Sequence, residues 1–204
     1  VSRANGIIVD DFDRAALAKR FPYISTKVIA ATYSPRDAVA NPRLATPATA
    51  RAAKGLGVTI IENCCATHIE PTGGRFTIKI DDGRQFTATH LVNSAGAWAA
   101  DLAARFGEPV PAFAAGPPQF VTEPLPYFIG PSLQTIDGSV IARQIPRGNV
   151  ILAGYPRTAS DPVANRAPVP PHKTVTGMAA LASVVPALAS ASVIRVWSGI
   201  EAYL

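Results

Sequence analysis

The sequence LVNSAGAWA, residues 91–99, joins an apolar segment to a helical one through four residues with almost no side-chain bulk. Leu91 and Val92 close a segment with strand character, and residues 98–106 have helical spacing that ends at Gly107. Backbone N–H groups at the start of such a helix can face an anionic ligand, and small side chains let a flat ligand approach the main chain. A tightly packed strand-to-helix turn also requires small residues. Both interpretations therefore stay open on these residues alone.

The composition is that of a globular protein. Of the 204 residues, 48% are hydrophobic and 16% are charged, and a chain of this length buries roughly 70% of its unfolded surface in one large or two small domains. No apolar run reaches the ~20 residues that a membrane span needs. The net charge is +5, but the basic residues are scattered and lack interleaved aromatic residues, so we expect no nucleic-acid binding.

The cysteines and the absence of a secretion signal predict a cytoplasmic protein. Cys64 and Cys65 are neighbours in a predicted strand. Neighbouring strand residues point to opposite faces, so a disulfide between them would be strained. We therefore expect two reduced thiols in the core.

The fold class predicted by the hydrophobic pattern is α/β (α+β). We expect helices over residues 10–20 and from Pro42 or Thr46 to about Gly55. Strands are predicted at 58–62, 64–70 and 75–80, with a return strand at 84–93 after the Asp81-Asp-Gly83 turn. Prolines then separate antiparallel strands at 119–122, 139–144 and 149–153. A helix over 174–188, interrupted or ended at Pro186, precedes a strand over 193–198.

The residues alone indicate no mechanism. His68, His90 and His172 lie far apart without further ligands at suitable spacing, so we expect no metal site. Gly55-Leu-Gly57 lacks the third glycine of a dinucleotide fingerprint and ends a predicted helix. The abrupt ends at Val1 and Leu204 predict a middle piece of a longer protein.

Several motifs follow one another in a fixed order. They are Ala31-Thr-Tyr-Ser-Pro-Arg-Asp37 with Asn41-Pro42, Gly57-Val-Thr-Ile-Ile-Glu62, Leu91-Val-Asn-Ser-Ala-Gly-Ala-Trp98, Val121-Thr-Glu-Pro124, Arg143-Gln144, Gly148-Asn-Val-Ile-Leu152 and Arg195-Val-Trp-Ser-Gly199. In order and spacing, from about Gly6 to Leu204, the chain resembles the central part of the FAD-dependent D-amino-acid-oxidase-like (DAO) oxidoreductases. The Thr-Glu-Pro and Trp-x-Gly-Ile-Glu-x-Tyr details most resemble the branch of opine oxidases, hydroxyproline dehydrogenases and hydrogen-cyanide-synthase subunits.

The resemblance implies an arrangement of domains. Residues 1–107 would be a partial FAD-binding, Rossmann-like domain without its N-terminal Gly-x-Gly-x-x-Gly unit. Residues 108–192 would be a substrate domain with an antiparallel sheet, and residues 193–204 the return into the FAD domain. The sheet from Phe120 to Tyr155 would cover the face of the flavin ring.

The resemblance also implies site residues. Ala66 would contact FAD through its backbone. The turn residues that would lie against the cofactor are Ser94, Ala95, Gly96, Ala97 and Trp98. Arg143 and Gln144 are candidates for pairing with a substrate carboxylate, because arginine offers two parallel donors. A solvated strand arginine is the alternative for Arg143.

The implied activity is oxidation of the C–N bond of a small-molecule substrate, an amino acid, imino acid or opine-type amine, with hydride transfer to FAD. No catalytic residue is assigned. Where the oxidases have an arginine two residues beyond Trp-x-Gly, this chain has Glu201, so we do not expect simple D-amino-acid oxidation, and we expect the isolated chain to be inactive. The alternative is a non-catalytic binding module derived from the family. A partner subunit or self-association is compatible with both.

Overall fold

Two compact units make up the chain. The computed structural model describes residues 3–154 and 156–204, so Tyr155, at the end of the predicted sheet, and residues 1–2 lie outside the described residues. One unit holds residues 38–94, and the other holds residues 1–37 with 95–204. These bounds differ from the predicted division at residue 107, because the N-terminal segment packs with the C-terminal half.

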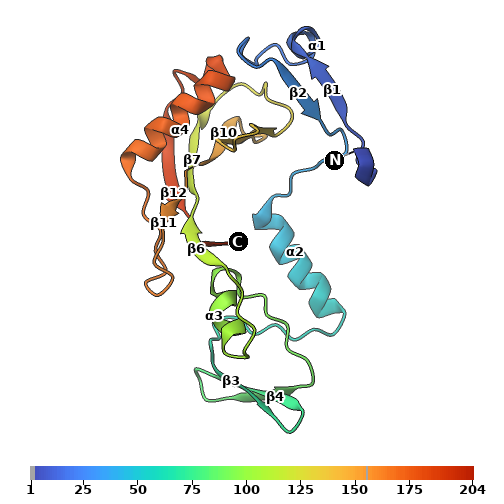
Figure 1. Cartoon of the computed structure of the whole chain (residues 1–204), viewed down its shortest axis with the longest axis vertical. Helices are drawn as coiled ribbons and strands as arrows, with labels where there is room; N and C mark the ends of the chain where they lie inside the picture. Colours follow the sequence, from blue (N-terminus) through green and yellow to red (C-terminus); the bar gives the residue numbers. More distant parts are fainter. Residues whose placement is uncertain (1–2, 155) are drawn as a thin grey trace. The chain divides into compact units, whose positions relative to one another are not determined.

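The larger unit is built on a five-stranded antiparallel sheet (Figure 1). Its strands stand in the order β12-β7-β10-β9-β8. Their bounds are β7 (Pro118–Pro124), β8 (Leu133–Gln134), β9 (Val140–Gln144), β10 (Asn149–Gly154) and β12 (Val193–Ser198). Four of these strands match the predicted segments. The two-residue β8 is too short to show an alternating pattern.

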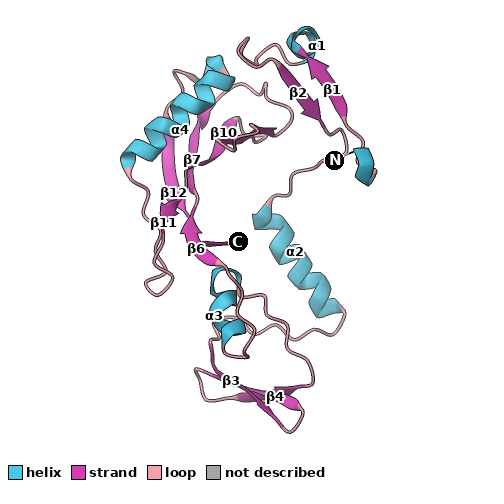
Figure 2. Ribbon diagram, viewed as in Figure 1, coloured by secondary structure: helices cyan, strands magenta, loops and turns pink. Residues whose placement is uncertain are grey.

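Helix α4 (Pro171–Val184) covers one face of this sheet (Figure 2). It begins at Pro171, before the predicted start at Thr174, and a short turn, η3 (Pro186–Leu188), follows it. Gly177 allows close packing, because an added Cβ would lie 3.0 Å from Phe120 Cε1 and 3.1 Å from Leu152 Cδ2. The core between helix and sheet contains Phe120, Val140, Val150, Leu152 and Leu181.

A second, three-stranded sheet has the order β11-β6-β13. Its strands are β6 (Phe113–Gly116), β11 (Thr158–Ala159) and β13 (Glu201–Tyr203). The turn η2 (Gly96–Trp98) packs against β6 and β13, and α3 (Ala99–Ala104) follows it. The strand predicted over residues 84–93 does not extend to Leu91 and Val92, and the predicted helix is confirmed only from Ala99, after the tighter η2 turn.

The N-terminal segment forms η1 (Arg3–Asn5), β1 (Asp10–Asp13), α1 (Arg14–Arg20) and β2 (Ala30–Tyr33). The helix predicted over 10–20 is wrong in its first turn, where β1 pairs with β2 instead. Asp13 ends that strand and caps the helix, accepting the Ala16 N–H at 2.8 Å. Phe12 anchors β1 through edge-on contacts with Phe21 and Tyr33.

Tyr23 joins this segment to the sheet of the same unit. Its ring packs edge-on against Phe21 and Phe128, at centroid distances of 6.1 and 5.7 Å. Its hydroxyl is buried and has no hydrogen-bond partner among the described residues. Burial, with a smaller contribution from Tyr127, raises the pKa of Tyr23 to about 12.

Replacing Tyr23 with phenylalanine is expected to raise the free energy of unfolding by about 1 kcal/mol, because the ring contacts remain and an unsatisfied buried hydroxyl is removed. The raised pKa means that the folded state favours the neutral phenol. The wild-type protein therefore loses stability as the pH rises from the ordinary value of 10.0 through about 12. Urea unfolding at neutral pH and across that range measures both effects. If Tyr23→Phe instead lowers the free energy of unfolding, the Tyr23 hydroxyl must have a hydrogen-bond partner in the folded protein.

The smaller unit, residues 38–94, contains one helix and one sheet. Helix α2 (Pro42–Gly55) begins at the first of its two predicted starts, where the side chain of Asn41 accepts the Arg43 N–H at 3.1 Å. The sheet has the order β3-β4-β5, with bounds β3 (Ala66–Thr72), β4 (Arg75–Ile80) and β5 (Gln85–Ala88). The predicted turn at Asp81–Gly83 is confirmed, and Gly73 and Gly74 form the turn between β3 and β4.

Three predictions for this unit are wrong. The strand predicted at 58–62 is not formed, and the strand predicted at 64–70 begins only at Ala66, as β3. The return strand is limited to β5. Cys64 is half-buried and Cys65 is exposed, so they are free thiols but not core residues.

Candidate functional site

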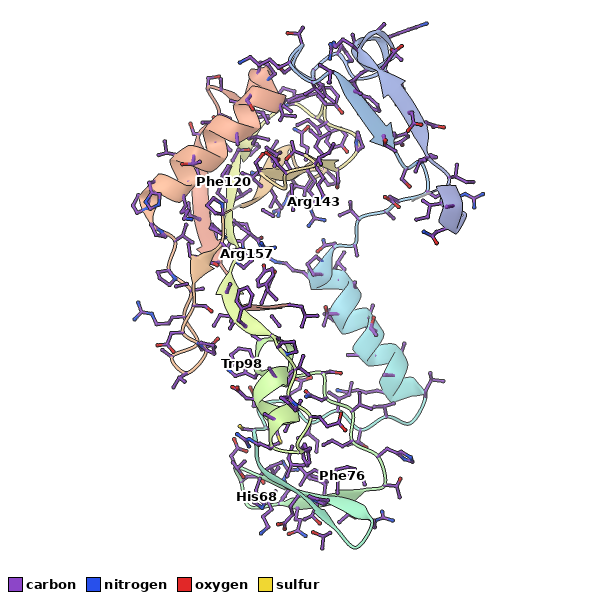
Figure 3. The ribbon with its side chains drawn as sticks, in the orientation of Figure 1. His68, Phe76, Trp98, Phe120, Arg143 and Arg157 are labelled. Carbon is purple, nitrogen blue, oxygen red and sulfur yellow. The ribbon has the colours of Figure 1, made fainter. Side chains whose placement is uncertain are left out.

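Arg143 and Gln119 lie on the face of the five-stranded sheet that α4 does not cover. Neighbouring strand residues point to opposite faces, so Arg143 and Gln119 lie opposite to the buried Phe120. The register places Ile151 between Val121 and Arg143. In Figure 3, Phe120 lies on the α4 side of the sheet and Arg143 on the other.

A cavity of about 280 Å³ opens on this face, and we call it the sheet cavity. It is lined by Gln119, Ser132, Ile141, Ala142, Arg143, Ile151 and Ala153. Arg143 is partly buried, and most of its neighbours in this wall are apolar. Such surroundings limit screening by water and strengthen an ionic contact with a ligand.

Gln144 is placed on the opposite face from Arg143. It is 6% exposed, and its Oε1 accepts the N–H groups of Phe128 at 2.8 Å and Ile129 at 3.0 Å. Its Nε2 donates to the carbonyls of Pro126 and Gly148, each at 2.9 Å. These bonds saturate the amide and tie the loop after β7 to the β9–β10 hairpin. This geometry speaks against a substrate contact, and Gln144 has no part in the site proposed below.

A second cavity of about 460 Å³ lies at the end of the same face, and we call it the strand-end cavity. It shares Gln119, Ile141 and Ala153 with the sheet cavity. Its charged and phenolic side chains are Asp137, Arg157, Glu201 and Tyr203. The two cavities are therefore neighbours along one continuous wall.

Arg157 and Tyr203 form a stacked pair in the strand-end cavity. The guanidinium carbon of Arg157 lies 3.8 Å from the centroid of the Tyr203 ring, within the range of a cation–π contact. The Tyr203 hydroxyl donates to Glu201 Oε2 at 2.6 Å. Burial and this hydrogen bond raise the pKa of Tyr203, so the phenol remains a neutral donor at physiological pH.

Asp137 is held by its own turn. Its Oδ1 accepts the N–H of Ser139 at 3.0 Å and the hydroxyl of Ser139 at 2.8 Å. Hydrogen bonds from Thr135 and Ser139 lower the pKa of Asp137 to about 2. Its carboxylate stays ionised and already has donors.

The turn predicted to lie against the cofactor presents exposed main chain. Gly96 has a φ of +57°, and a Cβ built there would meet nothing within 4 Å. No side chain caps η2, so its first N–H groups, those of Gly96 and Ala97, can face a ligand. Trp98 is fixed beside them, because its Nε1 donates to the carbonyl of Pro162 at 3.1 Å. An open main chain with uncapped donors fits a flat anionic cofactor such as FAD.

The structure distributes the predicted cofactor residues over both units. Ala66, exposed at the start of β3, and Ser94 belong to the smaller unit. Ala95, Gly96, Ala97 and Trp98 belong to the larger one. The described residues contain no cluster of side chains suited to a metal ion. None of the described helices has the length and apolar character to cross a membrane.

Sequence reasoning missed Gln119, Arg157 and Tyr203. Gln119 carried a usable signal, because strand alternation places it on the face opposite to the apolar Phe120. Arg157 gave none, and Tyr203 entered only as the last residue of Trp-x-Gly-Ile-Glu-x-Tyr. The two residues are brought together only by the pairing of β11 and β13 with β6.

The sequence matches the model of a known protein family over nearly its whole length. The DAO family model, described as FAD dependent oxidoreductase, matches residues 1–203. A comparison with curated protein sequences gave no match.

Solved structures share the fold. L-proline dehydrogenase from P. horikoshii is 22% identical, with a TM-score of 0.86 over 97% of this chain and 54% of that chain. Glycine oxidase from Geobacillus kaustophilus is 21% identical, with a TM-score of 0.84 over 98% of this chain and 53% of that chain. L-amino acid deaminase from Proteus vulgaris is 17% identical, with a TM-score of 0.79 over 98% of this chain and 59% of that chain. The chain thus spans little more than half the length of these proteins, and the predicted fold class is confirmed.

Proposed function

The chain belongs to the DAO family of FAD-dependent oxidoreductases, and from this premise we propose that the full-length protein oxidises the C–N bond of an amino acid, an imino acid or an opine-type amine. One observation carries the proposal. A partly buried arginine, Arg143, stands in an otherwise largely apolar cavity on the sheet face that α4 leaves open. The names of the similar structures, a proline dehydrogenase, a glycine oxidase and an amino acid deaminase, support a substrate of this class.

The residues of the larger unit would bind and orient the substrate. Arg143 would hold the substrate carboxylate through two parallel N–H donors. Gln119 stands on the shared wall of both cavities, where its amide can hydrogen-bond the substrate. Ile141, Ile151 and Ala153 would exclude water around the reacting carbon. Positioning of this kind supplies much of the rate enhancement in reactions whose chemistry belongs to a cofactor.

The cofactor would be held by the residues that the resemblance indicates. They are Ala66, Ser94, Ala95, Gly96, Ala97 and Trp98. When bound, FAD supplies the acceptor for the hydride that leaves the carbon next to the substrate nitrogen. The substrate is left as an imine, which water hydrolyses to a carbonyl compound and an amine or ammonia. Residues 95–98 would contribute small side chains and the N–H groups of η2.

Anaerobic mixing of the FAD-loaded full-length protein with a panel of substrates tests the function. The panel contains amino acids, cyclic imino acids and N-carboxyalkyl amino acids, and the absorbance of the oxidised flavin is the readout. We expect at least one class to bleach the flavin, while 2-methylalanine, which has no hydrogen on the reacting carbon, leaves it oxidised. A full-length protein that never retains FAD would instead indicate the non-catalytic module.

Replacing Gly96 with alanine is expected to weaken FAD binding about tenfold or more. The new Cβ would occupy the space in front of the exposed main chain, and the positive φ adds strain of about 1 kcal/mol. Gly107→Ala is the matched control, because Gly107 also has a positive φ and open surroundings but lies beyond α3. Titration of the apoprotein with FAD measures both dissociation constants. If both variants lose FAD affinity to the same extent, η2 is not part of the cofactor site.

A further inference from the structure

The strand-end cavity contains a cation that is held in place but has no ionic partner among the described residues. Arg157 forms no ion pair with a described carboxylate. The two carboxylates of the cavity are engaged elsewhere, Glu201 by the Tyr203 hydroxyl and Asp137 by Ser139. A guanidinium in this state can bind an anionic group of a ligand.

Two contacts keep Arg157 in position. The guanidinium carbon lies over the Tyr203 ring, 3.8 Å from its centroid, and this cation–π contact restricts the motion of the guanidinium. Lys173 Nζ donates to the carbonyls of Pro156 at 3.2 Å and of Arg157 itself at 3.4 Å, which holds the backbone. A donor fork that is already oriented loses less conformational entropy when it binds a carboxylate.

The two cavities place Arg157 and Arg143 along one wall. The sheet cavity contains Arg143, the strand-end cavity contains Arg157, and Gln119, Ile141 and Ala153 line both. A ligand that lies along this wall meets a guanidinium in each cavity and the amide of Gln119 between them.

Resting on the proposed function, we propose that the substrate carries a second anionic group, which Arg157 binds while Arg143 binds the first carboxylate. Tyr203 is a positioning residue that restricts the motion of the guanidinium, and Glu201 holds Tyr203 through its hydroxyl. The substrate class is therefore an amine with two carboxylates, in which the nitrogen and the reacting carbon lie between the two charged ends.

Binding of unreactive carboxylates to the full-length, FAD-loaded protein tests this proposal without turnover. The probes are unbranched dicarboxylates from malonate to pimelate, each compared by calorimetry with the monocarboxylate of the same carbon number. We expect at least one dicarboxylate to bind about tenfold more tightly than its monocarboxylate, since a single charge-assisted contact contributes on the order of 1.5 kcal/mol. No preference at any length would overturn the proposal.

Substitutions test which residues produce the preference for dicarboxylates over monocarboxylates. Arg157→Gln is expected to reduce the preference for the dicarboxylate below about twofold, whereas Arg147→Gln, in the exposed β9–β10 turn, keeps the preference. Tyr203→Phe retains a ring under the guanidinium and most of the preference, and Tyr203→Leu loses it. A preference that survives Arg157→Gln contradicts the assignment. A protein that prefers dicarboxylates but whose flavin no amine reduces would refute the proposed oxidation and leave the assignment of Arg157 intact.

Discussion

Replacing Gln144 with leucine is expected to lower the free energy of unfolding of the full-length protein by about 3–5 kcal/mol. The leucine side chain fills a similar volume but makes none of the hydrogen bonds to the loop at Pro126–Ile129 and to Gly148. The N–H groups of Phe128 and Ile129 and the carbonyl of Pro126 would lose this partner, whereas the Gly148 carbonyl keeps the Leu125 N–H. Each unsatisfied buried group costs about 1–3 kcal/mol.

Gln134→Leu provides the matched control. Gln134 lies on β8 at the edge of the same sheet and is exposed, so we expect a change within about 0.5 kcal/mol. Urea unfolding measures both variants. A loss smaller than about 1 kcal/mol for Gln144→Leu would mean that the amide does not hold the loop, and it would restore Gln144 as a candidate for substrate binding.

Replacing Arg143 with glutamine is expected to lower kcat/KM for the best substrate at least about 100-fold, because a charge-assisted, bidentate contact of about 3 kcal/mol is lost. The loss should appear chiefly in KM if the carboxylate is bound equally in the ground state and the transition state. FAD content should not change, because Arg143 lies in the sheet cavity and not on the η2 turn.

Arg147→Gln is the control for the loss of a positive charge. Arg147 lies in the exposed turn between β9 and β10, close to Arg143 in sequence but outside both cavities. We expect its kcat/KM to stay within about twofold of the wild type. Steady-state kinetics and flavin absorbance are the measurements. Equal effects of the two substitutions would show that Arg143 acts through the general positive field alone.

The contrast between Arg143 and Gln144 shows what strand periodicity predicts. The segment over residues 139–144 is predicted as a short strand between proline-containing turns, and β9 confirms it. Strand geometry places neighbouring residues on opposite faces, so the two side chains could not share one ligand. Because Arg143 and Gln144 are neighbours in sequence, a common role was predicted for them. Strand geometry instead places their side chains on opposite faces of the sheet.

Sequence patterns of a few residues were enough to predict the turns and the helix start that depend only on neighbouring residues. The turns of the β3-β4-β5 sheet follow from their glycines, and the start of α2 follows from the Asn41 cap and Pro42. The segment at 10–13 was assigned to a helix, because its pairing with β2 and the packing of Phe12 on Tyr33 depend on residues far along the chain. The stacked pair of Arg157 and Tyr203 depends on tertiary pairing in the same way.

A crystal structure of the full-length protein with FAD and a bound carboxylate inhibitor tests the central claim most directly. The claim is that the open face of the five-stranded sheet forms the substrate wall of a flavin-dependent amine oxidoreductase. The account predicts a carboxylate of the inhibitor in the sheet cavity, paired with the guanidinium of Arg143 at hydrogen-bonding distance and lying between this sheet face and the flavin ring. An inhibitor bound away from this face, with Arg143 directed into solvent, would contradict it.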